Sequence, residues 1–348
     1  MNRLKHLQQT LEKNIQDNYL KGHVEFVLLD YNSQDGLEEW VSKNMRTYID
    51  EGILVYYKTT EPTHYLRSHS RNMAFRLANA TILCNLDADN FLGKGFADYI
   101  INEFSKQDSI FCTTNRSFDG TYGRICVRSE DFALIRGYNE ALQGWGFEDN
   151  DFYYRFQLQG LKPVSFHNPE FYHYIEHPDT ERIADEFMFK NLKEMYIAYL
   201  NPFTSSILLF FENFTTEQYT FVNNYHLNVL VDFLQKDKPL FDDRDRITVQ
   251  EKNSKGIWKE ENNAIIIQEN GKQYFGHRET PCFDLNGKSF YIVQNDTLKI
   301  KILLLLTAGI NYNQAKKQYT NNLIVNPDGF GKGIVIKNFN FSKKIVLS

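Results

Sequence analysis

Two aspartates separated by one small residue follow an apolar segment in the first third of the chain. They are Asp87 and Asp89, directly after Thr81–Leu86. Carboxylate oxygens suit hard divalent cations such as Mg²⁺ or Mn²⁺, and the phosphate oxygens of a substrate can complete the coordination shell. The same pattern also occurs in phosphatases and in ordinary turns. It therefore indicates a metal site without deciding the reaction.

A second acidic cluster follows a tryptophan that lies between two glycines. The stretch Gly144–Asp151 reads GWGFEDND and places Glu148 and Asp149 at the expected start of a helix. The helix dipole favours acidic side chains there, so plain capping would explain the acids. Capping leaves Trp145 unexplained, whereas an indole beside carboxylates can stack on a sugar ring while a carboxylate deprotonates a hydroxyl. The stretch therefore favours a sugar-binding site that accepts a proton.

Two histidines lie four residues apart in the segment that follows. His173 and His177 would share one face of a helix, but Pro169 and Pro178 favour a loop or strand here. On spacing alone, a metal-binding role and a role as ordinary surface histidines both stay open.

Helical and extended segments alternate through the first half of the chain. The periodicity of apolar residues predicts helices over 3–17 and about 68–80, and strands over 23–30, 52–58 and 81–86. Such alternation is typical of an α/β fold with a mostly parallel sheet and helices on its faces. Ligands bind beyond the carboxyl ends of strands in these sheets, where Asp30 and Asp87 are expected.

The second half of the chain has a different pattern, in which expected helices are followed by expected strands. Helices are expected over 129–136, 147–159, 182–200 and 216–236. After about residue 240, Asn-Gly turn signals at 270–271 and 286–287 separate expected strands over 264–268, 290–293, 298–306, 322–325, 333–336 and 344–347. We therefore predict an α/β domain over 1–200, a helical connector over 201–240 and an antiparallel, sandwich-like β domain over 241–348.

Composition narrows the class of protein. A net charge of −5 disfavours general nucleic-acid binding, and no apolar run approaches the roughly 18–20 residues that span a bilayer. The first residues lack the apolar core of a signal peptide, and Cys84, Cys112 and Cys126 lie in short apolar runs typical of buried thiols. These features predict a cytoplasmic protein, at most peripheral at the membrane.

Aromatic residues make up 15% of the chain. In the C-terminal part, Trp258 and its aromatic neighbours would serve either as the core of a β sandwich or as a carbohydrate-binding face. Composition does not decide between these uses.

Three segments together resemble a known family. They are LLDYNSQDG (28–36), HSRNMAFRLANATILCNLDADN (69–90) and RGYNEALQGWGFEDNDFYYR (136–155). In this order and spacing, the chain resembles family 2 glycosyltransferases of the GT-A fold, close to the bacterial chondroitin-polymerase-like and β-1,4-galactosyltransferase-like groups. The resemblance covers residues 1 to roughly 180 and implies a Rossmann-like nucleotide-diphospho-sugar transferase domain.

The resemblance implies a role for each matching residue on the donor side. Asp30 would bond the uracil base, and Arg71 would lie on the diphosphate side. Asp87 would contact the ribose or the metal, and Asp89 would ligate Mn²⁺ or Mg²⁺. Arg3, in a segment that resembles the family's N-R-x-x-x-L, would also reach UDP.

On the acceptor side, the resemblance makes Asp149 the general base. Glu148 would hold the acceptor sugar, and Trp145 would close over it. One downstream histidine would complete the metal site. Counting from Glu148 favours His173, which we prefer, whereas the local context favours His177.

The chain opens where the family's first strand would end, so we expect a sheet one strand short and a weakened uracil pocket. The implied activity is a metal-dependent, inverting transfer of galactose or an N-acetylhexosamine from a UDP-sugar. The acceptor would be a glycan or lipid-linked glycan in bacterial surface polysaccharide synthesis. Two alternatives stay open: a nucleotide-sugar-binding or glycan-binding protein on the same fold without turnover, and a nucleotidyltransferase or phosphatase that uses the Asp87–Asp89 turn.

Overall fold

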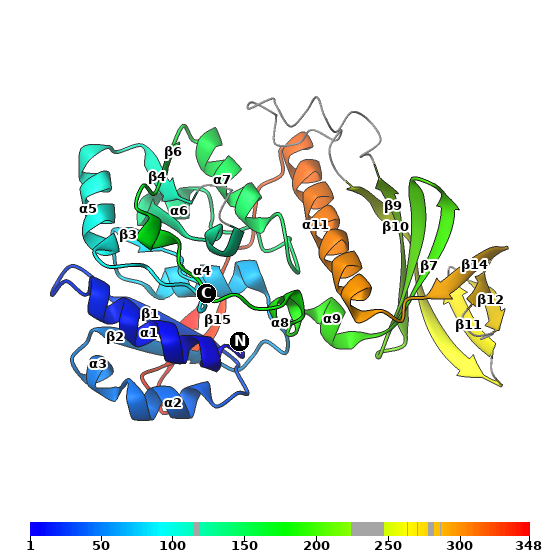
Figure 1. The fold of residues 1–348 in the computed structure, drawn as a ribbon, viewed down its shortest axis with the longest axis horizontal. Helices are drawn as coiled ribbons and strands as arrows, with labels where there is room; N and C mark the ends of the chain where they lie inside the picture. The colour runs from blue at the N-terminus through cyan, green and yellow to red at the C-terminus, as the bar shows by residue number, and fades with distance from the viewer. Residues whose placement is uncertain (115–118, 224–246, 263, 270, 278–281, 286) are drawn as a thin grey trace. The chain divides into compact units, whose positions relative to one another are not determined.

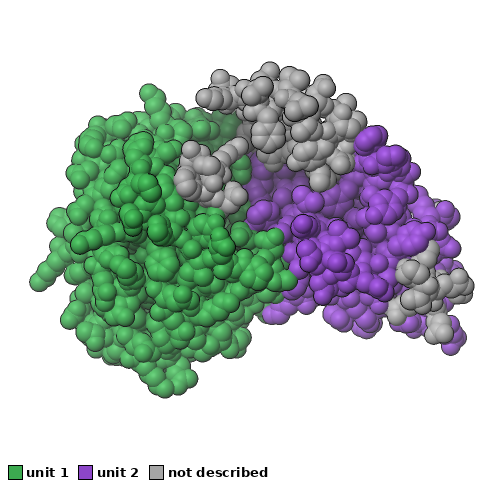
Figure 2. All heavy atoms as spheres, viewed as in Figure 1, with its two compact units in different colours: residues 1–143, 148–185, 322–348 green, residues 144–147, 186–321 purple. Residues whose placement is uncertain are grey.

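The computed structural model describes residues 1–348 except 115–118, 224–246, 263, 270, 278–281 and 286 (Figure 1). The described chain divides into two compact units (Figure 2). The first comprises residues 1–143, 148–185 and 322–348, and the second comprises 144–147 and 186–321. Each unit has its own buried apolar clusters, and we describe each by itself.

The first unit contains two four-stranded sheets. One has the order β1-β2-β15-β16, with β1 parallel to β2 and the other two pairs antiparallel. The other has the order β3-β5-β4-β6, with β4 parallel to β6 and the remaining pairs antiparallel. The strands are β1 (Phe26–Tyr31), β2 (Leu54–Thr59), β3 (Ile82–Cys84), β4 (Ile110–Thr113), β5 (Ile125–Arg128), β6 (Lys162–Ser165), β15 (Gly333–Lys337) and β16 (Lys344–Leu347).

Helices supply the remaining apolar surface of this unit. Helix α1 buries Leu7, Leu11 and Ile15 in a cluster with residues of α2 and β2, as its spacing predicts. Helix α5 packs Phe96 and Ile100 into a second cluster with residues of β4. The helices are α1 (Leu4–Asn18), α2 (Leu37–Asn44), α3 (Arg46–Asp50), α4 (Arg67–Leu77), α5 (Phe96–Lys106), α6 (Ser129–Leu134), α7 (Glu148–Leu158) and α8 (Asp179–Ile183), with short 3-10 turns η1 (Asp119–Thr121) and η2 (Pro169–Tyr172).

The second unit is an antiparallel sheet with one long helix. The strand order is β12-β11-β10-β9-β8-β7-β14-β13, and β12 contacts β13, so the sheet is nearly closed into a barrel. Helix α11 (Asp296–Thr320) packs on β10, and the short helix α9 (Phe187–Asn191) precedes the sheet. The strands are β7 (Leu192–Asn201), β8 (Thr204–Phe211), β9 (Thr215–Asn223), β10 (Ile247–Glu261), β11 (Ala264–Glu269), β12 (Lys272–His277), β13 (Cys282–Leu285) and β14 (Lys288–Ile292).

Several expected elements of the second half are wrong. The spacing predicts helices over 182–200 and 216–236, but β7 and β9 occupy much of those ranges, and residues 224–236 lie outside the described residues. Side chains of β7 such as Met195 and Tyr196 are buried, and β8 pairs with both strands. Cross-strand pairing therefore overrides the helical spacing. The expected connector over 201–240 is likewise sheet as far as it is described.

The run at 298–306 is also wrong as a strand, because it lies inside α11. Short apolar runs suit a buried strand and a buried helix equally well, and here the Asn295 side chain caps a helix by accepting from the backbone N–H of Leu298 at 2.9 Å. No strand forms over 322–325.

Two further expectations on the sheets need correction. The first unit has mixed sheets in place of a mostly parallel one. Residues 333–337 and 344–347 are strands as predicted, but β15 pairs with β2, so residues 322–348 belong to the first unit. The C-terminal β region is therefore a near-barrel over part of 186–321 and no sandwich over 241–348. Among the described residues, no helix has both the length and the apolar character to cross a membrane.

Candidate active site

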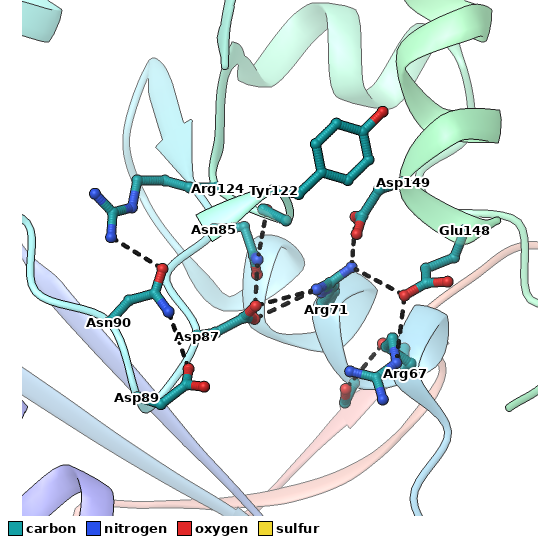
Figure 3. Close-up of polar contacts among 12 residues, drawn as sticks. Arg67, Arg71, Asn85, Asp87, Asp89, Asn90, Tyr122, Arg124, Glu148 and Asp149 are labelled. Atoms are coloured by element: carbon teal, nitrogen blue, oxygen red, sulfur yellow. Dashed lines mark hydrogen bonds and ion pairs between the residues drawn. The ribbon is translucent and has the colours of Figure 1, made fainter. Parts of the chain in front are cut away.

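Asp87 and Asp89 lie in the turn that follows β3 (Figure 3). The backbone N–H of Asn90 donates to the carbonyl oxygen of Asp87 at 3.0 Å, which closes the turn. The Asn85 side-chain amide donates to Asp87 Oδ1 at 3.3 Å and to the carbonyl oxygen of Gly123 at 2.9 Å. These bonds fix Asp87 at the carboxyl end of β3, as the sequence predicts.

Asp89 is held by a chain of bonds that begins at a buried arginine. Asn90 Nδ2 donates to Asp89 Oδ1 at 3.0 Å, and Arg124 Nη2 donates to Asn90 Oδ1 at 2.9 Å (Figure 3). Arg124 also donates to the carbonyl oxygens of Phe91 and Phe171. Its burial lowers the pKa of the guanidinium from its usual value, and these carbonyl contacts offset the loss of hydration. Arg124 therefore positions the turn.

The second oxygen of Asp89 meets a histidine. His177 Nε2 lies 2.8 Å from Asp89 Oδ2, and the imidazole is 8% exposed. His173 is exposed and contributes its carbonyl oxygen, which accepts from the backbone N–H of Phe91 at 2.9 Å. The structure thus brings His177 to Asp89, although counting along the sequence favours His173.

Another histidine lies beside this pair. His6 on α1 is fully buried, and its ring meets the His177 ring edge-on at a centroid distance of 5.3 Å. Neither ring nitrogen of His6 has a hydrogen-bond partner among the described residues, although Glu181 Oε1 lies 3.5 Å from Nε2. Burial lowers the pKa of His6, which favours the neutral imidazole that ligates metals.

The donor atoms on the Asp89 side fit a divalent cation. Asp89 and His177 offer one carboxylate and one imidazole, a set that suits Mn²⁺ and leaves positions for phosphate oxygens and water. In the part of the chain that is described, no three His, Cys, Asp or Glu side chains form a complete metal cage. Such a cation would therefore be shared with a ligand.

A buried arginine of α4 joins the turn to α7. Arg71 Nη1 donates to Asp149 Oδ1 at 2.7 Å, and Nη2 donates to Asp87 Oδ1 at 3.3 Å (Figure 3). Glu148 Oε1 lies 3.9 Å from Nη1, and the guanidinium lies over the Tyr138 ring at 5.2 Å from its centroid. Three acids from two distant segments thus converge on one cation.

The charges in this cluster do not cancel. Asp87, Glu148 and Asp149 face Arg71 and Arg67, whose Nε lies 3.3 Å from Glu148 Oε1. Burial raises the pKa of Asp87, but Arg71 and Arg67 outweigh it and leave that pKa below its usual value. For Asp149, burial together with the charges of Glu148 and Asp87 outweighs Arg71 and raises the pKa to about 7.

One carboxylate oxygen of Glu148 accepts no hydrogen bond from the described residues. The residue is 6% exposed, and its Oε1 faces Arg67 and Arg71. Its Oε2 is the buried oxygen that lacks a hydrogen-bond partner in the described part of the chain. A buried oxygen without a donor is costly, so a hydroxyl-bearing ligand at this position would stabilise it.

Gly123 allows the cluster to close. A Cβ at this position would lie 2.7 Å from Arg71 Nη2, 3.1 Å from Asp87 Oδ2 and 3.4 Å from Asp149 Oδ2. The first distance is shorter than any tolerated contact, so a side chain here would displace the arginine. The backbone of Gly123 therefore forms one wall of the site.

The side chains of Arg3 and Asp30 form hydrogen bonds with other residues of the protein. Arg3 Nη2 donates to the carbonyl oxygen of Glu181 at 2.5 Å. Asp30 is fully buried, and its two oxygens accept from the backbone N–H of Ser33 and from the Tyr56 hydroxyl, both at 2.8 Å. Nucleotide contacts by Arg3 and Asp30 stay predictions.

Trp145 belongs to the second unit, where its loop packs on α11. Thr307 Oγ1 donates to the carbonyl oxygen of Trp145 at 2.8 Å, and Asn311 Nδ2 donates to that of Gly146 at 2.8 Å. A Cβ at Gly146 would lie 2.7 Å from the Ala308 side chain, so this glycine is required for the close approach. The predicted stacking of the Trp145 indole on a sugar stays a prediction.

Besides Asn90, which follows Asp89 directly, five residues of the site are absent from the set predicted from sequence. Arg67 lies one helical turn before Arg71, a spacing that could have revealed it. Asn85 precedes Asp87 by two positions and shares its strand-end turn. The roles of His6, Gly123 and Arg124 depend on contacts between distant segments, and the sequence carries no local signal for them.

Part of the chain matches a known protein family. Residues 114–190 match the family described as N-terminal domain of galactosyltransferase, a span that contains Glu148, Asp149, His173 and His177. A search of curated proteins gave no match.

Solved structures with some similarity include two of Drosophila β1,4-galactosyltransferase 7. One is a mutant in complex with manganese, UDP-Gal and xylobiose, with 18% identity and a TM-score of 0.33 over 47% of this chain and 75% of that one. The other is the catalytic domain in complex with xylobiose, with 15% identity and a TM-score of 0.33 over 51% of this chain and 90% of that one. A third structure, GalNAc-T7 with UDP, GalNAc and Mn²⁺, has 10% identity and a TM-score of 0.39 over 85% of this chain and 78% of that one.

The family match confirms the resemblance to glycosyltransferases that the sequence motifs indicate, and it covers the segment that supplies Glu148 and Asp149 to the cluster around Arg71. Over residues 114–190, the chain therefore resembles the N-terminal domain of galactosyltransferase.

Proposed function

We propose that this protein transfers galactose or an N-acetylhexosamine from a UDP-sugar to a hydroxyl of a glycan, with inversion at the anomeric carbon and with the help of Mn²⁺ or Mg²⁺. The main support for the proposal is that one unit contains two chemically different groups of side chains, one at each end of the candidate site. Asp89 and His177 offer metal-ligating atoms, while Arg71 holds Asp149, whose pKa is raised to about 7.

The metal end would hold the donor diphosphate. Asp89 Oδ2 and His177 Nε2 are the atoms that would bind the cation, with phosphate oxygens as further ligands. When bound, the cation supplies positive charge against the departing diphosphate. Asn90 and Arg124 keep Asp89 oriented, so the donor position is set before the ligand arrives.

The other end would act on the acceptor. A carboxylate with a pKa near 7 accepts a proton efficiently at neutral pH, so Asp149 is suited to deprotonate the attacking hydroxyl. The Oε2 atom of Glu148 lacks a partner among the described residues and would accept a hydrogen bond from the acceptor sugar. Arg71 keeps Asp149 beside Asp87, so the base stays aligned with the donor side.

The reaction itself is a displacement. The acceptor oxygen attacks the anomeric carbon as the bond to the diphosphate oxygen breaks, and the proton of the hydroxyl passes to Asp149. Attack from the face opposite the leaving group inverts the anomeric carbon. Given the cysteine pattern of the sequence, we place this reaction in the cytoplasm, on an acceptor that is a glycan or a lipid-linked glycan.

A donor and metal panel tests the proposal. The purified chain is incubated with UDP-galactose, UDP-glucose and their two N-acetyl counterparts, with Mn²⁺ or EDTA, over arrayed glycan acceptors, and the products are examined by NMR. We expect Mn²⁺-dependent transfer from a galactose-type donor and a product of inverted anomeric configuration.

Three other outcomes would each contradict the proposal. Retention of configuration would refute the direct displacement. Release of UMP with a nucleotidyl transfer would favour the nucleotidyltransferase alternative. Mn²⁺-dependent binding of the donor without turnover on any acceptor would favour a binding protein on the same fold.

A further inference from the structure

Three cysteines lie side by side across one sheet of the first unit. Cys84 on β3 is directly opposite Cys126 on β5, and Cys126 is directly opposite Cys112 on β4. Residues that are directly opposite each other in an antiparallel pair point to the same face of the sheet. The three thiols therefore form a row on one face, with Cys126 in the middle.

The backbone hydrogen bonds between β3 and β5 show how closely Cys84 and Cys126 approach each other. The backbone N–H of Asn85 donates to the carbonyl oxygen of Ile125 at 2.9 Å. When the register of the two strands continues by one residue, Asn85 lies opposite Ile125, so these two form a hydrogen-bonded pair. Because hydrogen-bonded and non-hydrogen-bonded pairs alternate, Cys84 and Cys126 form a non-hydrogen-bonded pair, in which the Cα atoms are about 4.5 Å apart and the side chains are close.

Cys112 and Cys126 are paired in the other way. The carbonyl oxygen of Thr113 accepts from the backbone N–H of Phe166, directly after β6, at 3.2 Å, so the backbone polar groups of Thr113 point away from β5. Those of Cys112, one residue earlier, therefore point to β5, and Cys112 forms a hydrogen-bonded pair with Cys126. The Cα atoms of such a pair are about 5.5 Å apart. Of its two neighbours in the row, Cys126 is thus closer to Cys84.

The three thiols also differ in their access to solvent. Cys84 is exposed, although its apolar run predicts a buried thiol, whereas Cys112 and Cys126 are buried as predicted. Burial raises the pKa of Cys112 to about 12 and raises the pKa of Cys126 well above its usual value. The thiolate is the reactive form of cysteine. Cys84 is therefore the thiol that meets a dissolved oxidant first, and Cys126 is the thiol beside it.

We propose that Cys84 and Cys126 are a redox-responsive pair that forms a reversible disulfide between β3 and β5. The oxidant is a small soluble disulfide, of which oxidised glutathione is an example. The Cys84 thiolate attacks it, which forms a mixed disulfide on Cys84 and releases one small thiolate. Cys126 then gives up its proton and attacks the Cys84 sulfur, which forms the bridge and releases the second small thiolate. Each released thiolate takes up one of the two thiol protons, so two protein thiols are oxidised and one small disulfide is reduced.

The bridge would act on the turn that carries the candidate metal site. Asn85 directly follows Cys84, and its side chain donates to Asp87 and to the carbonyl oxygen of Gly123 (Figure 3). Strand β3 has only three residues, so few hydrogen bonds hold it to β5. A covalent link at Cys84 would therefore hold the Asp87 turn against Gly123 and reduce its local opening. In a reducing compartment, disulfides of this kind are transient and serve to sense oxidants.

Glutathione redox buffers test the proposal in the full chain. A Cys282→Ser background removes the fourth cysteine. The protein is equilibrated with defined ratios of reduced to oxidised glutathione, quenched with acid, digested and mapped by mass spectrometry. We expect a cross-link between Cys84 and Cys126 that dithiothreitol reverses and that also forms in Cys112→Ala. Hydrogen exchange of the backbone N–H of Asn85, which bonds to β5, should slow by about tenfold or more in the oxidised protein.

Cys84→Ser is the matched control, because it leaves Cys112 directly opposite Cys126. We expect no internal cross-link in this variant, since a hydrogen-bonded pair holds its thiols too far apart. An equal yield of cross-link between Cys112 and Cys126 would overturn the geometric argument. A mixed disulfide on Cys84 that never proceeds to the bridge would overturn the proposal, as would a Cys84 that stays reduced at every ratio. The Cys282→Ser background alone decides between these outcomes if Cys112→Ala fails to fold. None of these readouts depends on sugar transfer, so the disulfide and the proposed function fail or succeed separately.

Discussion

Asp149→Asn should make the protein more stable at alkaline pH while it removes the proposed base. The pKa of Asp149 is raised by burial and by Glu148 and Asp87 from 3.8 to about 7. The folded chain therefore binds this proton more tightly than the unfolded chain does. The stability from this group is fully present below about pH 4 and is lost as the pH rises through about 7.

The size of the effect follows from linkage. Integrated from pH 5 to pH 8, the difference between the two pKa values removes about 3 kcal/mol from the free energy of unfolding of the wild type. The carboxamide introduced by Asp149→Asn does not titrate, so this loss should be absent from the variant. The substitution also changes the hydrogen bond that Arg71 donates to this side chain. That change contributes nearly the same free energy at each pH. It therefore has little influence on how the difference in stability between variant and wild type depends on pH.

Urea unfolding at pH 5, 6, 7 and 8 measures this effect, with hydrogen exchange of α7 as a probe of the first unit. We expect the stability of Asp149→Asn relative to wild type to rise between pH 5 and about pH 7 and to level off by pH 8. Asp50→Asn, a change of the same type at a side chain that is 57% exposed, is the matched control for substituting a carboxylate outside this cluster. A difference for Asp149→Asn that does not change with pH would refute the raised pKa and show that Arg71 keeps this carboxylate ionised.

The other predictions concern the cation, the wall of the site and the second unit. His177→Ala should weaken Mn²⁺ binding by at least about tenfold, measured by calorimetry in the presence of UDP, and His173→Ala should leave it unchanged. Weaker binding in His173→Ala alone would assign the cation to His173. Gly123→Ala should reduce transfer by about a hundredfold with an unchanged fold by circular dichroism, because its Cβ would displace Arg71; near-normal transfer would show that the cluster can relax. Gly309→Ala should destabilise the second unit by about 1–3 kcal/mol in thermal unfolding, because its Cβ would clash with the Val249 side chain. An unchanged midpoint would show that α11 can shift.

The first half of the chain could be predicted from sequence because its signals are local. Helix α1, strands β1 to β3 and helices α4, α6 and α7 lie close to where apolar spacing and glycine stops place them. Asp87 and Asp89 follow a strand, and Glu148 and Asp149 start a helix, as expected. Each of these features depends on a few neighbouring residues.

The parts that sequence reasoning missed depend on distant contacts. Residues 192–201 pair with β8 and become a strand, although their apolar spacing also suits a helix. Residues 333–337 return to pair with β2, which no local pattern reveals. In the site, His177 reaches Asp89 because η2 and the following loop fold back along the Asp89 turn, where the Ile175 N–H donates to the carbonyl oxygen of Asp89 at 2.8 Å.

Single-turnover transfer by Asp149→Asn tests the central claim most directly. The variant is loaded with UDP-galactose, or with whichever donor the panel identifies, in Mn²⁺, and product is followed after addition of the acceptor. If Asp149 is the base at one end and Asp89 with His177 holds the donor at the other, the variant should bind the donor with unchanged affinity and form no product on the wild-type timescale. Product formation at the wild-type rate would contradict the assignment of Asp149 as the base.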